Sequence, residues 1–295
     1  MNCIFIYNPN SGSGKIVKHL DYIKKILETK FDEVTLYATK SGEDARNKAS
    51  ESCGKFDVLV FSGGDGTVND IITGISRNDN RPILGYIPAG TVNDISKNLR
   101  ISKNPRKALK NIIDGDIINH DVGMINDKYF MYVSAIGTFT GVSYRTEQHL
   151  KRKYGKIAYA VDGLKDIVSP KMVDIKISAN GHNYNLKVPL LLVMNTKSVG
   201  GILFNKYGHL NDGYFDIVIV KNGINRGLAN IARLMIFGIR KKSLHKHFIF
   251  IKASDFVVTV NDDITWCIDG EAGPKGQVHI KNLHHHVQFF VPKIK

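Results

Sequence analysis

The stretch VLVFSGGDGT, residues 58–67, decides the fold of this chain. An apolar run from Val58 to Phe61 leads into three glycines around one carboxylate, Asp65, and a helical pattern follows. Glycines let the backbone approach a phosphate closely, and a helix N-terminus favours an anion. Because Asp65 would repel the phosphates unless a divalent metal lay between them, the stretch predicts a nucleotide and magnesium site. A glycine turn without a nucleotide is the plainer alternative.

Short apolar runs alternate with helical patterns on both sides of this stretch. Such alternation predicts an α/β domain with a parallel sheet, whose ligands bind where the strands end. We expect strands over residues 3–7, 33–38, 57–61 and 83–87, and helices over residues 16–29, 43–51, 68–76 and 105–113.

The pattern changes to period-2 alternation after about Asp121, which predicts an antiparallel β-sandwich. We expect an α/β nucleotide-binding domain over 1–121, joined by a C-terminal return at 287–295, and a β domain over 122–286. Two helices, over 146–167 and 225–239, should interrupt the β domain. Its strands are expected over residues 129–135, 173–178, 188–194, 215–220, 256–260, 265–268 and 277–280.

Two more loops follow predicted strands of the α/β half. The first runs from Asn8 to Lys15; it lacks the first glycine of a P-loop, and Val17 stands where the dinucleotide fingerprint needs its third glycine. The second contains Gly90, Thr91, Asn93 and Asp94, and repeats the pentapeptide GTVND of residues 66–70. Asn93 or Asp94 could equally be a helix N-cap. Three loops at one sheet edge favour a ligand.

Acidic turns mark the β half. Asp269 and Glu271 flank Gly270 directly after a strand, where paired acids could hold a metal and orient a hydroxyl, or simply form a charged hairpin turn. Asp212 lies in a turn that could bind a hard cation or be an ordinary Asp-Gly hairpin. Consecutive residues on a strand face opposite sides, so His284, His285 and His286 should not chelate one metal together, and we expect an edge or surface strand there.

The composition sets broad limits. With 295 residues and 43% apolar content, the chain can build two cores. Lys and Arg exceed Asp and Glu by 41 to 27, a net charge of +14 that favours nucleic acid or acidic lipid surfaces as partners without choosing between them. Three scattered cysteines predict reduced thiols, and the first residues lack a signal-peptide pattern, so we expect a cytoplasmic protein.

The ordered motifs as a set resemble the diacylglycerol kinase catalytic family, in its soluble bacterial branch, which is related to the sphingosine kinases. The resemblance implies an ATP- and Mg2+-dependent lipid kinase whose active site lies in a cleft between the two domains. The motifs that carry it are NPNSG at 8–12, GGDGT at 63–67, GTVND at 90–94, NDG at 211–213 and DGE at 269–271.

The resemblance also implies roles for single residues. Asp269 would be the general base, Asp65 would hold Mg2+ through water, and Asp94, Asp121 and Glu271 would join the acidic network. The His209 carbonyl, Asp212 and the Tyr214 carbonyl would hold a second, structural Mg2+. The ATP site would comprise Asn8, Pro9, Asn10, Ser11, Gly12, Thr39, Gly64, Asp65, Gly66, Thr67, Val68, Asn69, Asp70 and Thr91, to which the glycine loops add Gly63, Gly90, Asn93 and Asp94.

Two positions depart from the family pattern. Asp70 stands where Glu is usual, and Asn205 stands where the family often has Pro before the structural metal loop.

Residues 217–254 contain eight Lys or Arg and no acid, with arginines repeating every seven residues at 226, 233 and 240. One basic helix face there could meet anionic lipid headgroups or remain simply solvated.

We therefore expect a peripheral enzyme at the inner face of the membrane that phosphorylates a lipid hydroxyl, with diacylglycerol as the leading substrate and phosphatidic acid as its product. A soluble-substrate kinase of the NAD kinase type is the nearer alternative, since it shares the glycine-rich acidic loop. A basic, non-enzymatic protein that binds nucleic acid or anionic lipid is the other, but no nucleic-acid recognition motif is present, so we expect no nucleic-acid partner. A homodimer stays open.

Overall fold

The computed structural model describes residues 1–10, 16–138, 172–199, 202–203, 205–221, 229–231, 233–234, 238–239 and 247–294. The chain divides into two compact units: unit 1 comprises Met1–Val122 and His284–Lys295, and unit 2 comprises Gly123–Leu283. The boundaries expected from the sequence were 121/122 and 286/287.

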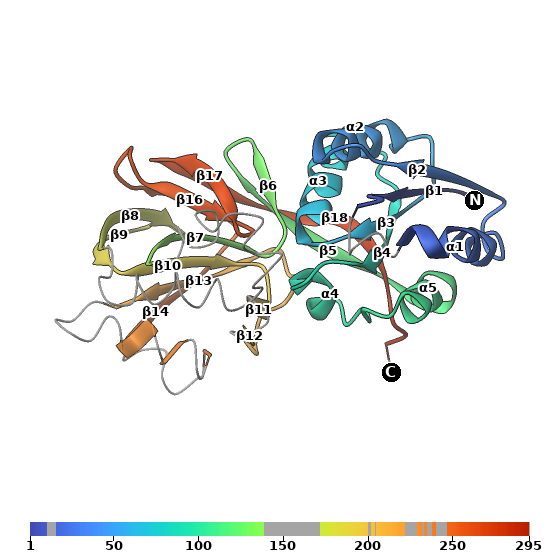
Figure 1. Ribbon diagram of the computed structural model, residues 1–295. Coiled ribbons are helices and arrows are strands. Elements are labelled where there is room, and N and C mark those ends of the chain that lie inside the picture. Colours follow the sequence, from blue (N-terminus) through green and yellow to red (C-terminus); the bar gives the residue numbers. More distant parts are fainter. Residues whose placement is uncertain are drawn as a thin grey trace. The chain divides into compact units, whose positions relative to one another are not determined.

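Unit 1 contains a mainly parallel sheet in the order β2, β1, β3, β4, β18, covered by helices (Figure 1). Helices α2 and α3 pack together on one face, and α1 and α5 lie together on the other. The strands are β1 Asn2–Tyr7, β2 Glu33–Ala38, β3 Val58–Gly63, β4 Ile83–Pro88 and the C-terminal part of β18 Val278–Val291, and the helices are α1 Leu20–Leu27, α2 Gly42–Ser52, α3 Asp65–Ile75, α4 Asp94–Asn98 and α5 Pro105–Asp114.

Local sequence explains these elements. Every residue of β3 is buried, as expected for a central strand covered on both faces. Helix α2 begins where the Ser41 side chain accepts a hydrogen bond from the Asp44 N–H, and α5 begins with Pro105 after Asn104, whose side chain accepts from the Arg106 N–H. The α/β fold class predicted from the sequence is confirmed.

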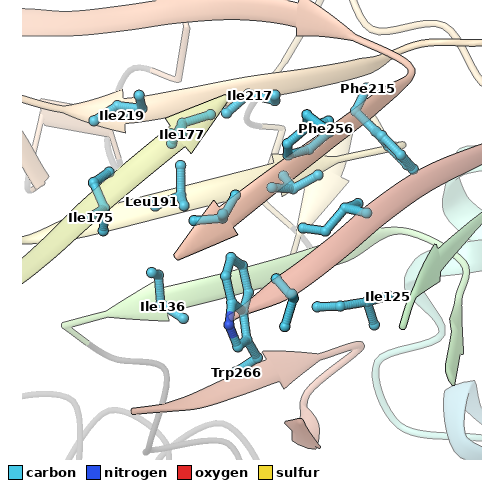
Figure 2. Packing of buried hydrophobic residues seen from close by; sticks show 14 of the residues in the cluster. Ile125, Ile136, Ile175, Ile177, Leu191, Phe215, Ile217, Ile219, Phe256 and Trp266 are labelled. Carbon is cyan, nitrogen blue, oxygen red and sulfur yellow. The ribbon is translucent and has the colours of Figure 1, made fainter. Parts of the chain in front are cut away.

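Unit 2 is built from two antiparallel sheets whose apolar faces form one core (Figure 2). One sheet has the order β18, β15, β8, β9, and the other has the order β14, β13, β10, β7, β16, β17. Ile175 and Phe256 from the first sheet and Leu191, Ile217 and Trp266 from the second all belong to this core. The strands are β7 Val133–Gly137, β8 Val173–Ala179, β9 His182–Val188, β10 Leu190–Met194, β13 Phe215–Val220, β14 Phe248–Ala253, β15 Asp255–Thr259, β16 Thr265–Ile268 and β17 Glu271–Lys275.

The remaining strands are short, apart from one that leads out of unit 1. Strand β5, Asp116–Ile125, runs from unit 1 into unit 2 and pairs with β6, Lys128–Phe130. Strands β11, Ser198–Val199, and β12, Ile202–Leu203, pair only with each other.

Some expectations need correction. The two strands expected at 277–280 and 287–291 are one strand, β18, which lies between β4 and β15 and is therefore not an edge. Strands β5, β9, β11, β12, β14 and β17 and the short helix α4 were not foreseen, and the strand expected over 129–135 is two strands, β6 and β7. The helix expected over 146–167 lies outside the described residues, as does most of the one over 225–239. Within the described ranges, no helix combines the length and apolar character needed to cross a membrane.

Candidate active site

The carboxyl ends of β1, β2, β3 and β4 share one edge of the unit 1 sheet. The parallel register pairs Tyr7 with Ala38 and with Ser62, and Ser62 with Ile87. The three predicted loops therefore all leave the sheet at this edge. In the first loop the Asn10 N–H donates to Asn8 Oδ1, and Ser11 and Gly12 lie outside the described residues. Thr39, which follows β2, is buried and donates its N–H to the Tyr7 carbonyl.

Glycines let the loops after β3 and β4 touch. A Cβ on Gly90 would lie 2.6 Å from the Gly64 Cα, and a Cβ on Gly63 would lie 2.1 Å from Thr67 Oγ1. The Ala89 N–H donates to the Gly63 carbonyl at 2.8 Å, and the Tyr86 hydroxyl donates to the same oxygen at 3.1 Å. No side chain fits at these positions, so the glycines are needed for the close approach of the two loops.

Asn93 fixes the shape of the second loop. It adopts a left-handed conformation with φ of 52°, which Asn tolerates better than most residues. Its side-chain oxygen accepts from the Gly90 N–H at 3.0 Å, and its amide donates to the Gly90 carbonyl at 2.6 Å. Asn93 is fully buried and makes no side-chain cap of α4. It therefore occupies the N-cap position considered from the sequence, but its side chain braces the loop instead of capping α4.

Asp65 and Asp94 bring two negative charges to this edge. Burial and the nearby charge of Asp94 raise the pKa of Asp65 above its usual value, while backbone hydrogen bonds, including one from the Ile95 N–H, oppose the shift. The Asp94 side chain is 2% exposed and pairs with Lys97 at 3.3 Å. Two carboxylates that repel each other beside glycine-lined loops are a suitable donor set for a hard divalent cation, so the residues present fit Mg2+.

Asp70 and Asn69 lie further along α3. The Asp70 carboxylate accepts from Arg46 of α2 at 3.0 Å and lies against Gly42, where a Cβ would approach Asp70 Oδ2 to 2.5 Å. Asn69 Oδ1 lies 3.5 Å from the Thr73 hydroxyl. The structure thus gives Asp70 a helix-to-helix ion pair, a contact that sequence reasoning did not foresee.

Asp269 of unit 2 is held by backbone donors. Its Oδ2 accepts from the Met131 N–H at 2.6 Å, and its Oδ1 accepts from the N–H groups of Tyr132 and Val133 at 3.0 and 3.1 Å. The Tyr132 hydroxyl donates to the Asp269 carbonyl at 3.0 Å. Such donors stabilise a carboxylate in its charged form and in one orientation.

Asp269 and Gly270 are also the two loop residues of the hairpin that joins β16 to β17. Both have positive φ, 48° and 89°, as a tight two-residue hairpin turn requires. The backbone therefore forms the hairpin turn considered from the sequence. This turn does not decide the chemical role of the Asp269 side chain. Glu271 begins β17 and is exposed, whereas Asp269 is buried, so the two acids lie in different environments.

The turn around Asp212 carries its own cation. Asp212 Oδ2 accepts from Lys252 Nζ at 2.6 Å, and Asp212 Oδ1 accepts from the Tyr214 N–H at 3.2 Å. The hydrogen bond to Asp212 is the main cause that raises the pKa of Lys252. An ammonium group therefore pairs with this carboxylate, as Lys97 pairs with Asp94, and a second magnesium at His209, Asp212 and Tyr214 stays a prediction. Lys252 was read from the sequence only as part of a basic stretch.

Comparisons with known proteins bear on the family of this chain. The family described as diacylglycerol kinase catalytic domain matches residues 2–125. A diacylglycerol kinase of Bacillus subtilis is 33% identical over 98% of this chain and 96% of its own length. One of Staphylococcus saprophyticus is 35% identical over 97% of this chain and 94% of its own.

A solved structure supports the same assignment. A crystal structure from Bacillus anthracis superposes with a TM-score of 0.84 and 26% identity, covering 98% of this chain and 97% of the other. The match therefore extends through both units and beyond the strand-end loops. The chain belongs to the diacylglycerol kinase catalytic family, whose members are kinases that transfer phosphate to an alcohol group.

Proposed function

We propose that this chain phosphorylates the hydroxyl of diacylglycerol with ATP and Mg2+ to give phosphatidic acid. The observation that carries the proposal is that Asp65 and Asp94, both at least partly buried, follow β3 and β4 at the edge where three loops leave the sheet. A kinase needs a cation beside its nucleotide, and this pair supplies ligands for one. The near full-length similarity to proteins named diacylglycerol kinase supports the choice of substrate.

The loops would bind the nucleotide mainly through backbone groups. Gly64 and Gly90 let the loops after β3 and β4 approach each other beside the start of α3, whose first N–H groups would bind phosphate. We assign the strand-end residues of the ATP set from Asn8 to Thr91 to this role, with Asp65 and Asp94 holding the metal. When bound, Mg2+ would neutralise the phosphates and polarise the γ-phosphoryl group.

Asp269 would orient the lipid hydroxyl and accept its proton as the oxygen attacks phosphorus. A carboxylate fixed by three N–H donors is held in one orientation, which favours positioning over strong basicity. Glu271 is exposed and would add negative charge to the acidic network that the family resemblance implies. In phosphoryl transfer most of the catalysis comes from positioning and charge neutralisation, so a weak base suffices.

The substrate would reach the enzyme from a membrane surface. The net charge of +14 favours anionic headgroups, and we propose peripheral attachment at the inner face of the membrane. The basic helix face expected around Arg233 lies mostly outside the described residues. Binding to vesicles should therefore strengthen with anionic lipid and weaken with salt.

The decisive assay measures transfer of labelled γ-phosphate from ATP to candidate acceptors in mixed micelles. The acceptors are diacylglycerol, sphingosine, phosphatidylglycerol, a polyprenol and, without micelles, NAD. We expect magnesium-dependent labelling of diacylglycerol, abolished by a chelator and in an Asp65→Asn preparation purified in parallel. Labelling of NAD alone would replace the proposal with the soluble-substrate alternative.

A further inference from the structure

Strand β18 brings two histidines together where regular strand geometry would separate them. His285 has a positive φ of 50°, which breaks the alternation of side chains along the strand. The rings of His284 and His285 consequently stack, with their centroids 3.7 Å apart. The expectation that consecutive histidines must face opposite sides is therefore wrong for this pair.

A buried carboxylate completes the group. Asp121 of β5 is 0% exposed, and its Oδ1 lies 3.1 Å from His284 Nδ1. The same oxygen accepts from the His285 backbone N–H at 2.8 Å. One ligand atom from each of Asp121, His284 and His285 lies within 4.8 Å of the others. The backbone contact fixes the carboxylate, while both imidazoles are exposed and can adjust.

One small metal ion could bridge His284 and Asp121 at this spacing, and His285 joins it once the two stacked rings turn apart, because a metal binds imidazole in the plane of the ring. Two ligands bound tetrahedrally at ~2.1 Å from zinc lie roughly 3.4 Å apart, close to the spacing of His284 Nδ1 and Asp121 Oδ1. Two imidazoles with one carboxylate favour Zn2+ and similar transition metals, whereas Mg2+ prefers oxygen ligands alone. The group thus differs in chemistry from the pair Asp65 and Asp94, although the resemblance placed Asp121 with that pair.

The three residues lie next to the points where the chain leaves and re-enters unit 1. Asp121 is the penultimate residue before the chain leaves unit 1 after Val122, and His284 is the residue at which the chain returns. We propose that Asp121, His284 and His285 bind one transition-metal ion, zinc by preference, with water as the fourth ligand. The ion links β5 to β18 where both strands pass out of unit 1, and so stabilises the folded chain.

The test is a calorimetric titration of zinc into chelator-treated, dialysed protein in the presence of excess Mg2+. We expect one equivalent to bind and to raise the melting temperature, and Co2+ to give the visible absorption of a tetrahedral site. His284→Gln and His285→Asn should each weaken zinc binding by at least about tenfold, since each removes a direct ligand. Asn is chosen at 285 because it tolerates positive φ.

His279→Gln is the matched control. His279 is an exposed histidine on the same strand whose Nε2 lies 2.5 Å from Asp255 Oδ1, and no three-ligand group of the described chain includes it. This variant should bind zinc like the wild type. Absence of saturable zinc binding by the wild type, or unchanged affinity in the His284→Gln, His285→Asn double variant, would overturn the proposal. Because the readouts are binding and melting, either failure leaves the proposed kinase activity untouched.

Discussion

Asp65 in unit 1 is partly buried and Asp269 in unit 2 is buried, and both lie beside glycines. Their surroundings nevertheless differ. Asp65 lies near a second carboxylate, and its pKa is raised by burial and by that charge. Asp269 accepts three backbone hydrogen bonds. Backbone hydrogen bonds only partly oppose the rise in the pKa of Asp65, whereas three backbone N–H groups bind the Asp269 carboxylate. These surroundings agree with the proposal that Asp65 helps to receive a cation and that Asp269 is held in one orientation.

Asp65→Asn should have the largest effect on turnover. It removes a carboxylate that is proposed to hold Mg2+ through water, and a catalytic metal contributes several kcal/mol to the transition state, so we expect a loss of at least about a thousandfold. The measurement is phosphate transfer to diacylglycerol at saturating ATP. Turnover within tenfold of the wild type would contradict a role for Asp65 in holding the metal.

Asp269→Asn should lower turnover by at least about a hundredfold, the usual contribution of proton acceptance. In the variant, an amide NH2 group takes the place of a carboxylate oxygen that accepts a backbone N–H. Two donors then face each other, which costs about 1–3 kcal/mol of folding stability. Turnover is therefore measured well below the melting temperature of the variant, together with ATP affinity. Unchanged ATP affinity with lost turnover supports the assignment; normal turnover in the folded variant refutes it.

Glu271→Gln tests the exposed acid of the hairpin against the buried one, Asp269. Glu271 is exposed, and a unit charge acting through water is worth only about 1 kcal/mol, so turnover should fall about fivefold. Stability should not change, because no hydrogen bond to this side chain holds the turn within the described residues. A loss as large as that of Asp269→Asn would show that the exposed acid, not the buried one, takes the proton.

Much of this could be predicted from the sequence. Apolar runs ending in glycines identified β1, β3 and β4 and the loops that follow them. Helix α4 was missed because five residues are too short to show a helical period. The donors that hold Asp269 come from Met131 to Val133, more than 130 residues earlier, and no local pattern announces such a partner. The strands expected at 277–280 and 287–291 are likewise one strand, β18, because no local pattern indicated that residues 281–286 continue it.

Lys252→Met should have the smallest effect. Lys252 is 44% exposed in its pair with Asp212, and exposed pairs contribute up to about 1 kcal/mol. The raised pKa of Lys252 means that this contribution is present below 10.5 and is lost as the pH rises through the folded-state pKa. Chemical denaturation at neutral pH measures it. If the ammonium replaces a structural magnesium, the variant should gain more stability from added Mg2+ than the wild type does, and equal gains would contradict this.

The most direct test of the central claim compares the melting temperatures of the wild type and Asp65→Asn, with a chelator and with saturating Mg2+ and ATP. A carboxyl whose pKa is raised on folding destabilises the native state above that pKa, an effect that disappears below its ordinary value of 3.8. With the chelator at neutral pH, Asp65→Asn should therefore melt at the higher temperature, and this advantage should fade toward pH 3.8. With Mg2+ and ATP at about a hundred times the dissociation constant, the wild type gains about 2.7 kcal/mol and the order should reverse. A variant that is less stable under the chelator, or equal stabilisation of both proteins by Mg2+ and ATP, would contradict the account.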